Sequence, residues 1–477
     1  MITNRTRRSV AFAVVAAFVL AACDGGSGDN VAGIDRTGAP AIAAYGTVNA
    51  FGSIAINGVH YDTSGATFTI DGEAGEQGDL GIGDVVLVKG TLDDGGTTGV
   101  ATSVRFDNNV EGPIASIDWA AAEFVVLGQV IRVNADTSFD GAIRPPVLSA
   151  LAVGDFVDVS GLVQNGGSIN ATRIKRRPAS DQVELTGRVA SNQAVQGLFA
   201  INAQIVDYQL ATLKGFPGDA VGNRQRVLVK GSLMNDVVRA ISVEYLSDEF
   251  RGASGELREV EGWVTRFTST TDFAVSGLPV TTDAQTVFEQ GTAADLALNV
   301  KVEVEGSLND AGVLAATNVA FRLAAPVRIV APVDSVSNAA SSFAVLGIAV
   351  QIDVLTRLED QSPQQLRPFA LANVDVGDIV EVRGTETPAG GGTVLAALVE
   401  RRAPQQDARL QGFVQSVTPP LFTVLGVQIA TNGGTKLDGI GSLAQLAVGD
   451  LVKVVGQKLG DRAIDAREVR VESESDD

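Results

Sequence analysis

One eight-residue pattern, Gly-Asp-x-Val-x-Val-x-Gly, recurs along the chain and decides the fold. It is clearest at Gly449-Asp450-Leu451-Val452-Lys453-Val454-Val455-Gly456. Apolar residues at alternate positions are typical of a half-buried β-strand, and the Gly-Asp pair is typical of a tight turn before that strand. Full or partial copies occur as GDVVLVKG (83–90), GDFVDVSG (154–161), RQRVLVKG (224–231), NVKVEVEG (299–306), GDIVEVRG (377–384) and GDLVKVVG (449–456).

A second element lies upstream of this strand and predicts a β-hairpin. It is seen as FVVLG (124–128), FAVLG (343–347) and FTVLG (422–426), with a looser copy FAVSG (273–277). In the first copy Asn57-Gly58 separates two short apolar runs, and Asn-Gly between such runs is the strongest short-range hairpin signal. A first strand such as Gly46-Thr47-Val48 and a last strand such as 99–106 complete the unit.

These elements predict an all-β chain built from six tandem repeats of about five short strands each. The glycines that close the pattern are 71, 70, 75, 78 and 72 residues apart. Units of this size fit a small five-stranded closed barrel of the oligonucleotide/oligosaccharide-binding (OB) type, and a five-stranded sandwich fits equally well. Links of a few residues between repeats favour stacking in chain order, as a rod. We place the repeats at 44–107, 108–177, 183–247, 258–323, 326–402 and 408–473.

The N-terminal residues predict export. Residues 1–22 combine an arginine-containing start with an apolar stretch too short to span a bilayer. The following Leu20-Ala21-Ala22-Cys23 resembles the lipobox of bacterial lipoproteins. That resemblance implies cleavage before Cys23 and attachment of lipid to it, with 23–43 as anchor and flexible tether. The protein is then expected on the inner or outer membrane, facing the periplasm or the cell surface.

The repeated strand, the Phe-containing hairpin, the tandem copies and the lipobox together resemble a bacterial envelope family, domain of unknown function 5666. The resemblance covers most of residues 44–472. It is weaker in the third and fourth repeats, where Gln225 and Val300 stand at the aspartate position. The family name carries no activity, cofactor or catalytic residue, so the resemblance implies only repeated small β domains on a lipoprotein.

Composition excludes several classes of chemistry. The 477 residues include one cysteine and one histidine, which rules out intrachain disulfides, cysteine-rich metal sites and any histidine mechanism shared by the repeats. His60 is therefore expected to be structural. With 56 acids against 36 bases and 5% aromatic residues, the chain also lacks the basic, aromatic surface of a nucleic-acid-binding protein. Two basic clusters, 174–177 and 400–402, are interpreted as linker charges. No catalytic constellation is recognised, which predicts a non-enzyme.

Carboxylates are the only abundant reactive groups, and they offer one candidate cofactor, Ca²⁺. Ca²⁺ prefers several carboxylate and carbonyl oxygens, which two acids converging at one barrel end could begin to supply. The alternative is structural: the Gly-Asp acids complete turns, and each second acid lies at a strand end and faces water, while its threonine satisfies a turn. The candidates are the Gly-Asp acids Asp84, Asp155, Asp378 and Asp450 and the Thr-x-apolar-acid residues Asp140, Glu289, Glu359 and Asp438.

The function predicted from these patterns is interaction. We expect a non-enzymatic, lipid-anchored cell-envelope protein that presents stacked acidic β repeats to another envelope protein, a polymer or itself. A net charge of −20 favours cationic partners or divalent ions. Two alternatives remain open: a small-ligand or divalent-cation module that uses carboxylates at barrel ends, and a divergent carboxylate-dependent hydrolase.

Overall fold

The protein is all-β, as predicted. The computed structural model describes residues 40–472 apart from 52, 94–95, 135–136, 145–146, 248–251, 323–324 and 388–390. The described residues form 38 strands and seven single-turn 3₁₀-helices, and no α-helix. Cys23, the predicted signal peptide and the predicted tether up to residue 39 lie outside them. The end of the predicted tether is wrong, because residues 41–43 pair with 89–91 and form the start of the first strand.

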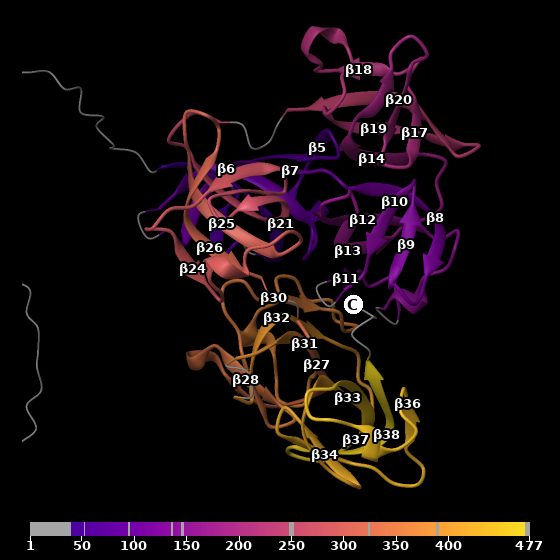
Figure 1. Ribbon diagram of the computed structural model, residues 1–477, viewed down its shortest axis with the longest axis vertical. Coiled ribbons are helices and arrows are strands. Elements are labelled where there is room, and N and C mark those ends of the chain that lie inside the picture. Colours follow the sequence, from indigo (N-terminus) through magenta and orange to yellow (C-terminus); the bar gives the residue numbers. More distant parts are fainter. Residues whose placement is uncertain are drawn as a thin grey trace, which may run out of the picture. The chain divides into compact units, whose positions relative to one another are not determined.

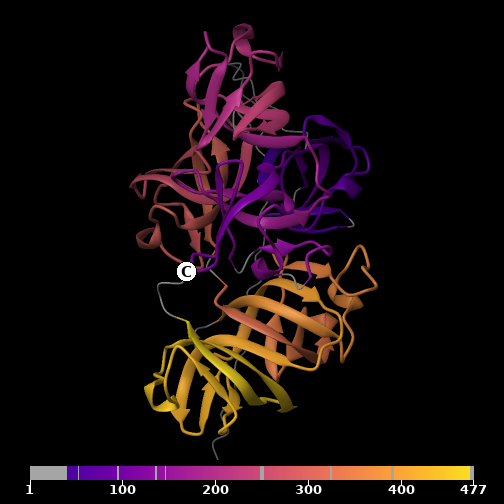
Figure 2. The same cartoon turned by 90° about the vertical axis from the view of Figure 1, so that its right-hand side faces the viewer.

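The last repeat shows how each unit closes (Figures 1 and 2). Its first strand, β33 (Ala408–Thr418), pairs with β34 (Leu421–Val424), and β34 pairs with β35 (Val427–Ala430). β35 then runs parallel to the last strand, β38 (Ala463–Glu472), which pairs with β37 (Leu451–Gly460). β37 returns to β33. The ring of first, second, third, fifth and fourth strands is a closed OB-like barrel, so the sandwich is excluded.

The same ring closes in the other repeats. In repeat 3 a break at Val189 divides the first strand into two. The ring strands are β1 (Ala41–Ala50), β2 (Ile54–Ile56), β3 (Val59–Asp62), β6 (Val85–Leu92) and β7 (Thr98–Phe106) in repeat 1, and β8 (Val110–Asp118), β9 (Glu123–Val126), β10 (Gln129–Arg132), β12 (Phe156–Val163) and β13 (Ile169–Arg176) in repeat 2. Repeat 3 has β14 (Val183–Arg188), β15 (Ala190–Gln193), β16 (Leu198–Ile201), β17 (Gln204–Asp207), β19 (Arg226–Met234) and β20 (Val237–Leu246). Repeat 4 has β21 (Leu257–Ser269), β22 (Asp272–Val275), β23 (Leu278–Thr281), β25 (Lys301–Leu308) and β26 (Leu314–Phe321), and repeat 5 has β27 (Val327–Ser337), β28 (Ser342–Val345), β29 (Ile348–Gln351), β31 (Ile379–Glu386) and β32 (Thr393–Arg401).

A short sixth strand, which the sequence patterns did not predict, runs parallel to the last strand of each repeat. It contains or directly precedes the acid of the Thr-x-apolar-acid motif where that motif occurs. A 3₁₀-helix then leads to the Gly-Asp turn. These strands are β4 (Thr67–Ile70), β11 (Ser138–Phe139), β18 (Thr212–Lys214), β24 (Val287–Glu289), β30 (Arg357–Asp360) and β36 (Lys436–Asp438), and repeat 1 adds β5 (Glu73–Gly75). The helices are η1 (Gln77–Asp79), η2 (Leu148–Ala150), η3 (Pro217–Asp219), η4 (Ala293–Asp295), η6 (Leu371–Asn373) and η7 (Leu443–Gln445), with η5 (Asn338–Ala340) in a hairpin.

The glycine that ends the repeated pattern lies inside its strand and does not terminate it. At Gly456 the pairing of β37 with β38 shifts register, which marks a β-bulge. A Cβ atom there would lie 2.1 Å from the carbonyl oxygen of Asp465. The other five repeats have the same shift at the matching glycine. Glycine is therefore required because the facing backbone leaves no room for a side chain.

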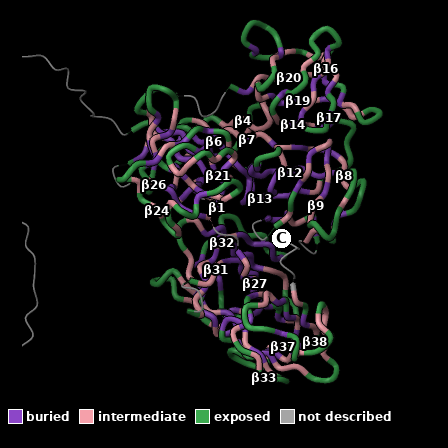
Figure 3. Tube along the Cα trace, viewed as in Figure 1, coloured by how far each residue is buried: buried purple, intermediate pink, exposed green. Residues whose placement is uncertain are grey.

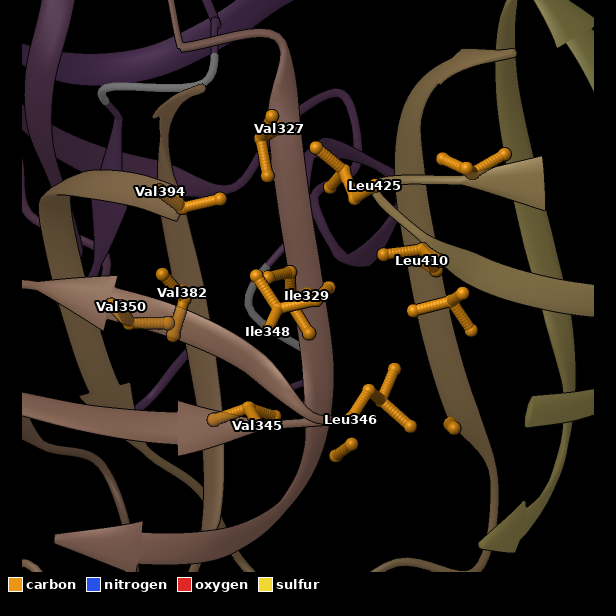
Figure 4. Close-up of a cluster of buried hydrophobic side chains, with 14 of the residues drawn as sticks. Val327, Ile329, Val345, Leu346, Ile348, Val350, Val382, Val394, Leu410 and Leu425 are labelled. Carbon is orange, nitrogen blue, oxygen red and sulfur yellow. The ribbon is translucent and has the colours of Figure 1, made fainter. Parts of the chain in front are cut away.

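Alternate residues of each ring fill its barrel with valine, leucine, isoleucine and phenylalanine (Figure 3). In repeats 5 and 6 these side chains form one continuous cluster, in which Leu346 and Leu425 lie between the two barrels (Figure 4). Repeats 2 and 3 also share a cluster, whereas repeats 1 and 4 each have their own. Burial of one such side chain contributes about 1.5–3 kcal/mol, so the shared clusters stabilise the repeats as pairs.

The first strands of the repeats also pair with one another. β1 runs parallel to β21, which joins repeat 1 to repeat 4. β8 pairs with β14, which joins repeats 2 and 3, and β27 pairs with β33, which joins repeats 5 and 6. The predicted stacking of repeats in chain order is therefore wrong, because repeat 1 pairs with repeat 4.

Candidate functional site

The Gly-Asp aspartates complete the turn before the fourth strand of each barrel. The preceding glycines have φ between 91° and 97°, a region that favours glycine. Each carboxylate accepts a hydrogen bond from the backbone N–H three residues earlier. The donor–acceptor distances are 2.7 Å for Asp84, 2.9 Å for Asp155, 3.0 Å for Asp378 and 2.8 Å for Asp450.

The threonines of the Thr-x-apolar-acid motif also have one structural role. Thr435 Oγ1 accepts a hydrogen bond from the Asn432 N–H at 2.9 Å and donates one to the Ala466 carbonyl at 2.8 Å. These bonds fix the sixth strand against the last strand. Thr137, Thr286 and Thr356 form the equivalent pair of bonds.

Five of the eight candidate metal ligands face a cation of the chain. The pairs are Asp84 with Lys175, Asp155 with Arg176, Glu359 with Arg173, Asp378 with Arg401 and Asp438 with Arg470. Asp140 accepts backbone N–H groups, Asp450 serves its turn and Glu289 is exposed. Within the described ranges no group of three or more Asp, Glu, His or Cys side chains is arranged to hold a metal ion.

Lys175, one of the basic residues interpreted as linker charges, lies instead in a buried network between repeats 1, 2 and 5 that also includes Arg173, whereas Arg177 of the same cluster is exposed. Lys175 Nζ lies 2.9 Å from Oδ2 of Asp84, which is fully buried. Arg173 donates to the Ile82 carbonyl at 2.6 Å and lies 3.3 Å from the Glu359 carboxylate. Buried ion pairs of this kind cost desolvation but hold one geometry, and removal of one partner is strongly destabilising.

A second group of acids lies where repeats 1, 2 and 3 meet: Asp158 is buried, and Asp71, Glu111 and Glu184 are half-buried. Glu111 and Glu184 are directly opposite on β8 and β14. Burial, together with Glu184, raises the pKa of Asp71 to about 8, and burial, together with Asp158, raises the pKa of Glu111 to about 7. Two cations lower the pKa of Glu111 and so oppose the increase: Arg177, which lies 3.1 Å from Asp158, and Lys230, which lies 3.1 Å from Glu184. These acids couple the stability of the fold to pH.

One cavity, of about 330 Å³, is lined by both acids and cations. Glu261 lies 3.0 Å from Lys301, and Glu303 pairs with Arg322, and both pairs lie within repeat 4. Burial alone would raise the pKa of Glu261, but Lys301 and hydrogen bonds from Thr47 lower it to about 2. The described lining also contains Asp353, Glu386 and Arg357, so this cavity has no single sign of charge.

The larger cavity, of about 620 Å³, has a different character. Its lining includes three arginines, Arg188, Arg224 and Arg226, and no Asp, Glu or Lys among the described residues. All three belong to repeat 3, whereas the rest of the lining comes mainly from repeats 2, 3 and 4. Asparagine, glutamine, two tyrosines and a few hydroxyl groups make up most of the other side chains. In a chain of net charge −20, this arrangement is a local positive site.

Two residues of the lining have buried hydroxyls without a partner. Thr186 is 7% exposed, and its Oγ1 has no hydrogen-bond partner among the residues that the structure describes. Ser276 Oγ is likewise buried and without a partner there. Both oxygens are closed off from solvent, so we take the larger cavity as the candidate functional site because of its arginines and not because of these hydroxyls.

None of the candidate metal ligands predicted from the sequence lines this cavity. His60 lies within 3.3 Å of the Ser53 hydroxyl in repeat 1, outside the cavity. Gln225 was recognised as a departure from the aspartate pattern, but the preceding Arg224 was not. The exchange of Gly-Asp for Arg-Gln in one repeat out of six is the signal that could have located the site.

Among the described residues, no helix is long and apolar enough to cross a membrane. No curated protein matches the chain. The model of the family described as a domain of unknown function, DUF5666, matches residues 42–105, 111–175, 261–320, 330–400 and 411–470. Repeat 3 lies between the second and third of these segments. Since the matched segments cover well over half of the chain, the protein belongs to the DUF5666 family.

Proposed function

We propose that the protein is a non-enzymatic, lipid-anchored component of the bacterial cell envelope that binds a partner protein or polymer. The observation that carries the binding part is the larger cavity, whose described lining has three arginines and no acid, in a chain whose barrel interiors are filled. Pockets of about 300–1,000 Å³ with a few convergent polar groups are the usual binding sites of small molecules and polymer segments.

The chemistry of the lining supports binding over catalysis. Guanidinium, amide and hydroxyl groups orient a ligand by hydrogen bonds. An arginine remains protonated in proteins, so it does not act as a general base near neutral pH. The lining thus offers recognition groups and no acid–base pair among the described residues.

The anchor part of the proposal rests on Leu20-Ala21-Ala22-Cys23 and the preceding signal-like residues. We expect Cys23→Ala to release the protein from membranes or to block its maturation, because the alanine has no sulfur to carry lipid. Fractionation of cells and mass spectrometry of the N-terminal peptide measure both effects. Asp24→Ser, one residue further on, is the control and should retain the lipid. Unchanged mass and fractionation of Cys23→Ala would refute the anchor.

A further inference from the structure

Repeats 3 and 4 both lack the glycine that precedes the fourth barrel strand, and among the six repeats only repeat 3 has a cation there, in the turn before β19. Gly83, Gly154, Gly377 and Gly449 occupy this turn in four repeats, with φ near 92°. In repeat 3 the residue is Arg224, with φ of 69°. A long L-side chain is disfavoured in this region, and such backbone strain concentrates at functional sites. Arg224 therefore strains the backbone of this turn, and a glycine at the same position would remove that strain.

The turn itself does not need this arginine. Gln225 replaces the aspartate as acceptor, and its Oε1 receives the Gly222 N–H at 2.6 Å. The backbone bonds between Arg224, Gln225 and Val189 are the same as those in the other repeats. The exchange of Gly-Asp for Arg-Gln preserves the hydrogen bonds and changes the local charge from negative to positive. Its consequence is electrostatic.

That positive charge lies at the larger cavity. Arg188 donates a hydrogen bond to the Arg224 carbonyl at 3.1 Å, which brings the two residues together on one wall. Both are exposed, and neither forms an ion pair with a residue that the structure describes. The described lining of the same cavity contains no Asp or Glu. Two exposed guanidinium groups without a described ion-pair partner, in a lining without acids, point to a bound anion.

We propose that repeat 3 is specialised to bind an acidic saccharide in this cavity; the proposal rests on the binding function proposed above. Guanidinium groups bind carboxylates through paired, charge-assisted hydrogen bonds. The exposed side chains of Asn165 and Asn223 also line the cavity, and amides of this kind can hydrogen-bond to the hydroxyl groups of sugar rings. A peptide would instead require pockets for apolar side chains, and the lining has few.

The test is a calorimetric titration of the full chain with a trimer of galacturonic acid. The matched neutral probe is the methyl ester of the same trimer, and inorganic tripolyphosphate is the non-saccharide anion. We expect the acid trimer to bind, the ester to bind at least tenfold more weakly, and the affinity of the acid trimer to fall as salt is added. Tripolyphosphate should bind more weakly than the acid trimer.

Two glycine substitutions provide matched variants. Arg224→Gly removes the cation and restores the residue that this turn has in four other repeats, so the melting temperature should not fall. Asn299→Gly changes the same turn in repeat 4, away from the cavity. We expect Arg224→Gly to weaken binding of the acid trimer at least tenfold and Asn299→Gly to leave it unchanged.

Four outcomes would overturn the proposal: no binding of the acid trimer, equal binding of the ester, tighter binding of tripolyphosphate, or unchanged binding by Arg224→Gly. The experiments distinguish a wrong saccharide proposal from a wrong binding function. If a probe within the cavity is captured by a partner in cells while the acid trimer does not bind, only the saccharide proposal fails.

Discussion

Replacement of Asp84 by asparagine should lower the free energy of unfolding by about 3 kcal/mol, because it leaves buried positive charge without its partner. Asp84 is fully buried and lies 2.9 Å from Lys175 and 3.9 Å from Arg173. Asparagine can still accept the turn hydrogen bond from Gly81, so the loss measures the ion pair. Denaturant unfolding followed by circular dichroism gives the free energy.

The sequence supplies a matched control for this substitution. Asp450 occupies the same turn in repeat 6 and accepts the same backbone bond, but it is not fully buried. Asp450→Asn should change the free energy of unfolding by no more than about 0.5 kcal/mol. Addition of Lys175→Met to the Asp84→Asn variant should recover part of the loss. Equal effects of the two asparagine substitutions would contradict a network held together by buried charge.

The second large effect is a dependence of stability on pH. Asp71 and Glu111 have pKa values raised to about 8 and about 7 in the folded protein. Between pH 5 and 8 the folded state therefore binds more protons than the unfolded state, so stability falls as pH rises. We expect these two groups to make the free energy of unfolding about 2 kcal/mol or more higher at pH 5 than at pH 8. The melting temperature should then be about 5 °C higher at pH 5 than at pH 8.

Asp71→Asn should make the melting temperature less dependent on pH, because asparagine does not titrate and, like aspartate, tolerates the φ of 48° at this position. Asp62→Asn is the control. Asp62 is exposed and its pKa is lowered by hydrogen bonds from Ser64, so it stays ionised throughout pH 5–8. Calorimetric melting at intervals of half a pH unit provides the comparison. A melting temperature that is constant or rises with pH would contradict the assigned acid cluster.

The features that could be predicted from sequence are local ones. Asn57-Gly58 forms the predicted hairpin turn between β2 and β3, with φ of 50° and 84°. The strand predicted within 449–456 forms as β37 (Leu451–Gly460), because Val452 and Val454 face one barrel interior. Hydrophobic alternation and turn chemistry act over a few residues, and six copies of the same signal make the barrel recognisable.

The contacts that could not be predicted join residues far apart in the chain. In the sequence, Lys175 belongs to a short basic cluster and is indistinguishable from a linker charge. Its pairing with Asp84 depends on the packing of repeat 1 against repeat 2. The parallel pairing of β1 with β21 depends in the same way on the approach of two repeats. The cavity could not be predicted for the same reason. Arg224 indicates a site only once the residues around it are known, and the described lining contains no acid.

The acidic composition of the whole chain does not indicate the charge of the candidate site. A net charge of −20 led to the expectation of cationic partners. The candidate site has the opposite sign, because three arginines of one repeat line a cavity without lining acids among the described residues. Net charge describes long-range repulsion and attraction, whereas a site is determined by the few groups that contact the ligand.

The central claim is that the protein binds a partner through the cavity of repeat 3, and site-specific photocrosslinking in cells tests it most directly. The probe is placed at Asn165, in the exposed turn between β12 and β13 at the cavity. The control position is Asp310, in the matching turn between β25 and β26. Asn309 makes the same backbone hydrogen bonds in that turn as Gln164 makes in the turn between β12 and β13. We predict a discrete adduct, seen as a mass shift of the full chain, from Asn165 and not from Asp310. No adduct at Asn165, or the same adduct at both positions, would contradict the account.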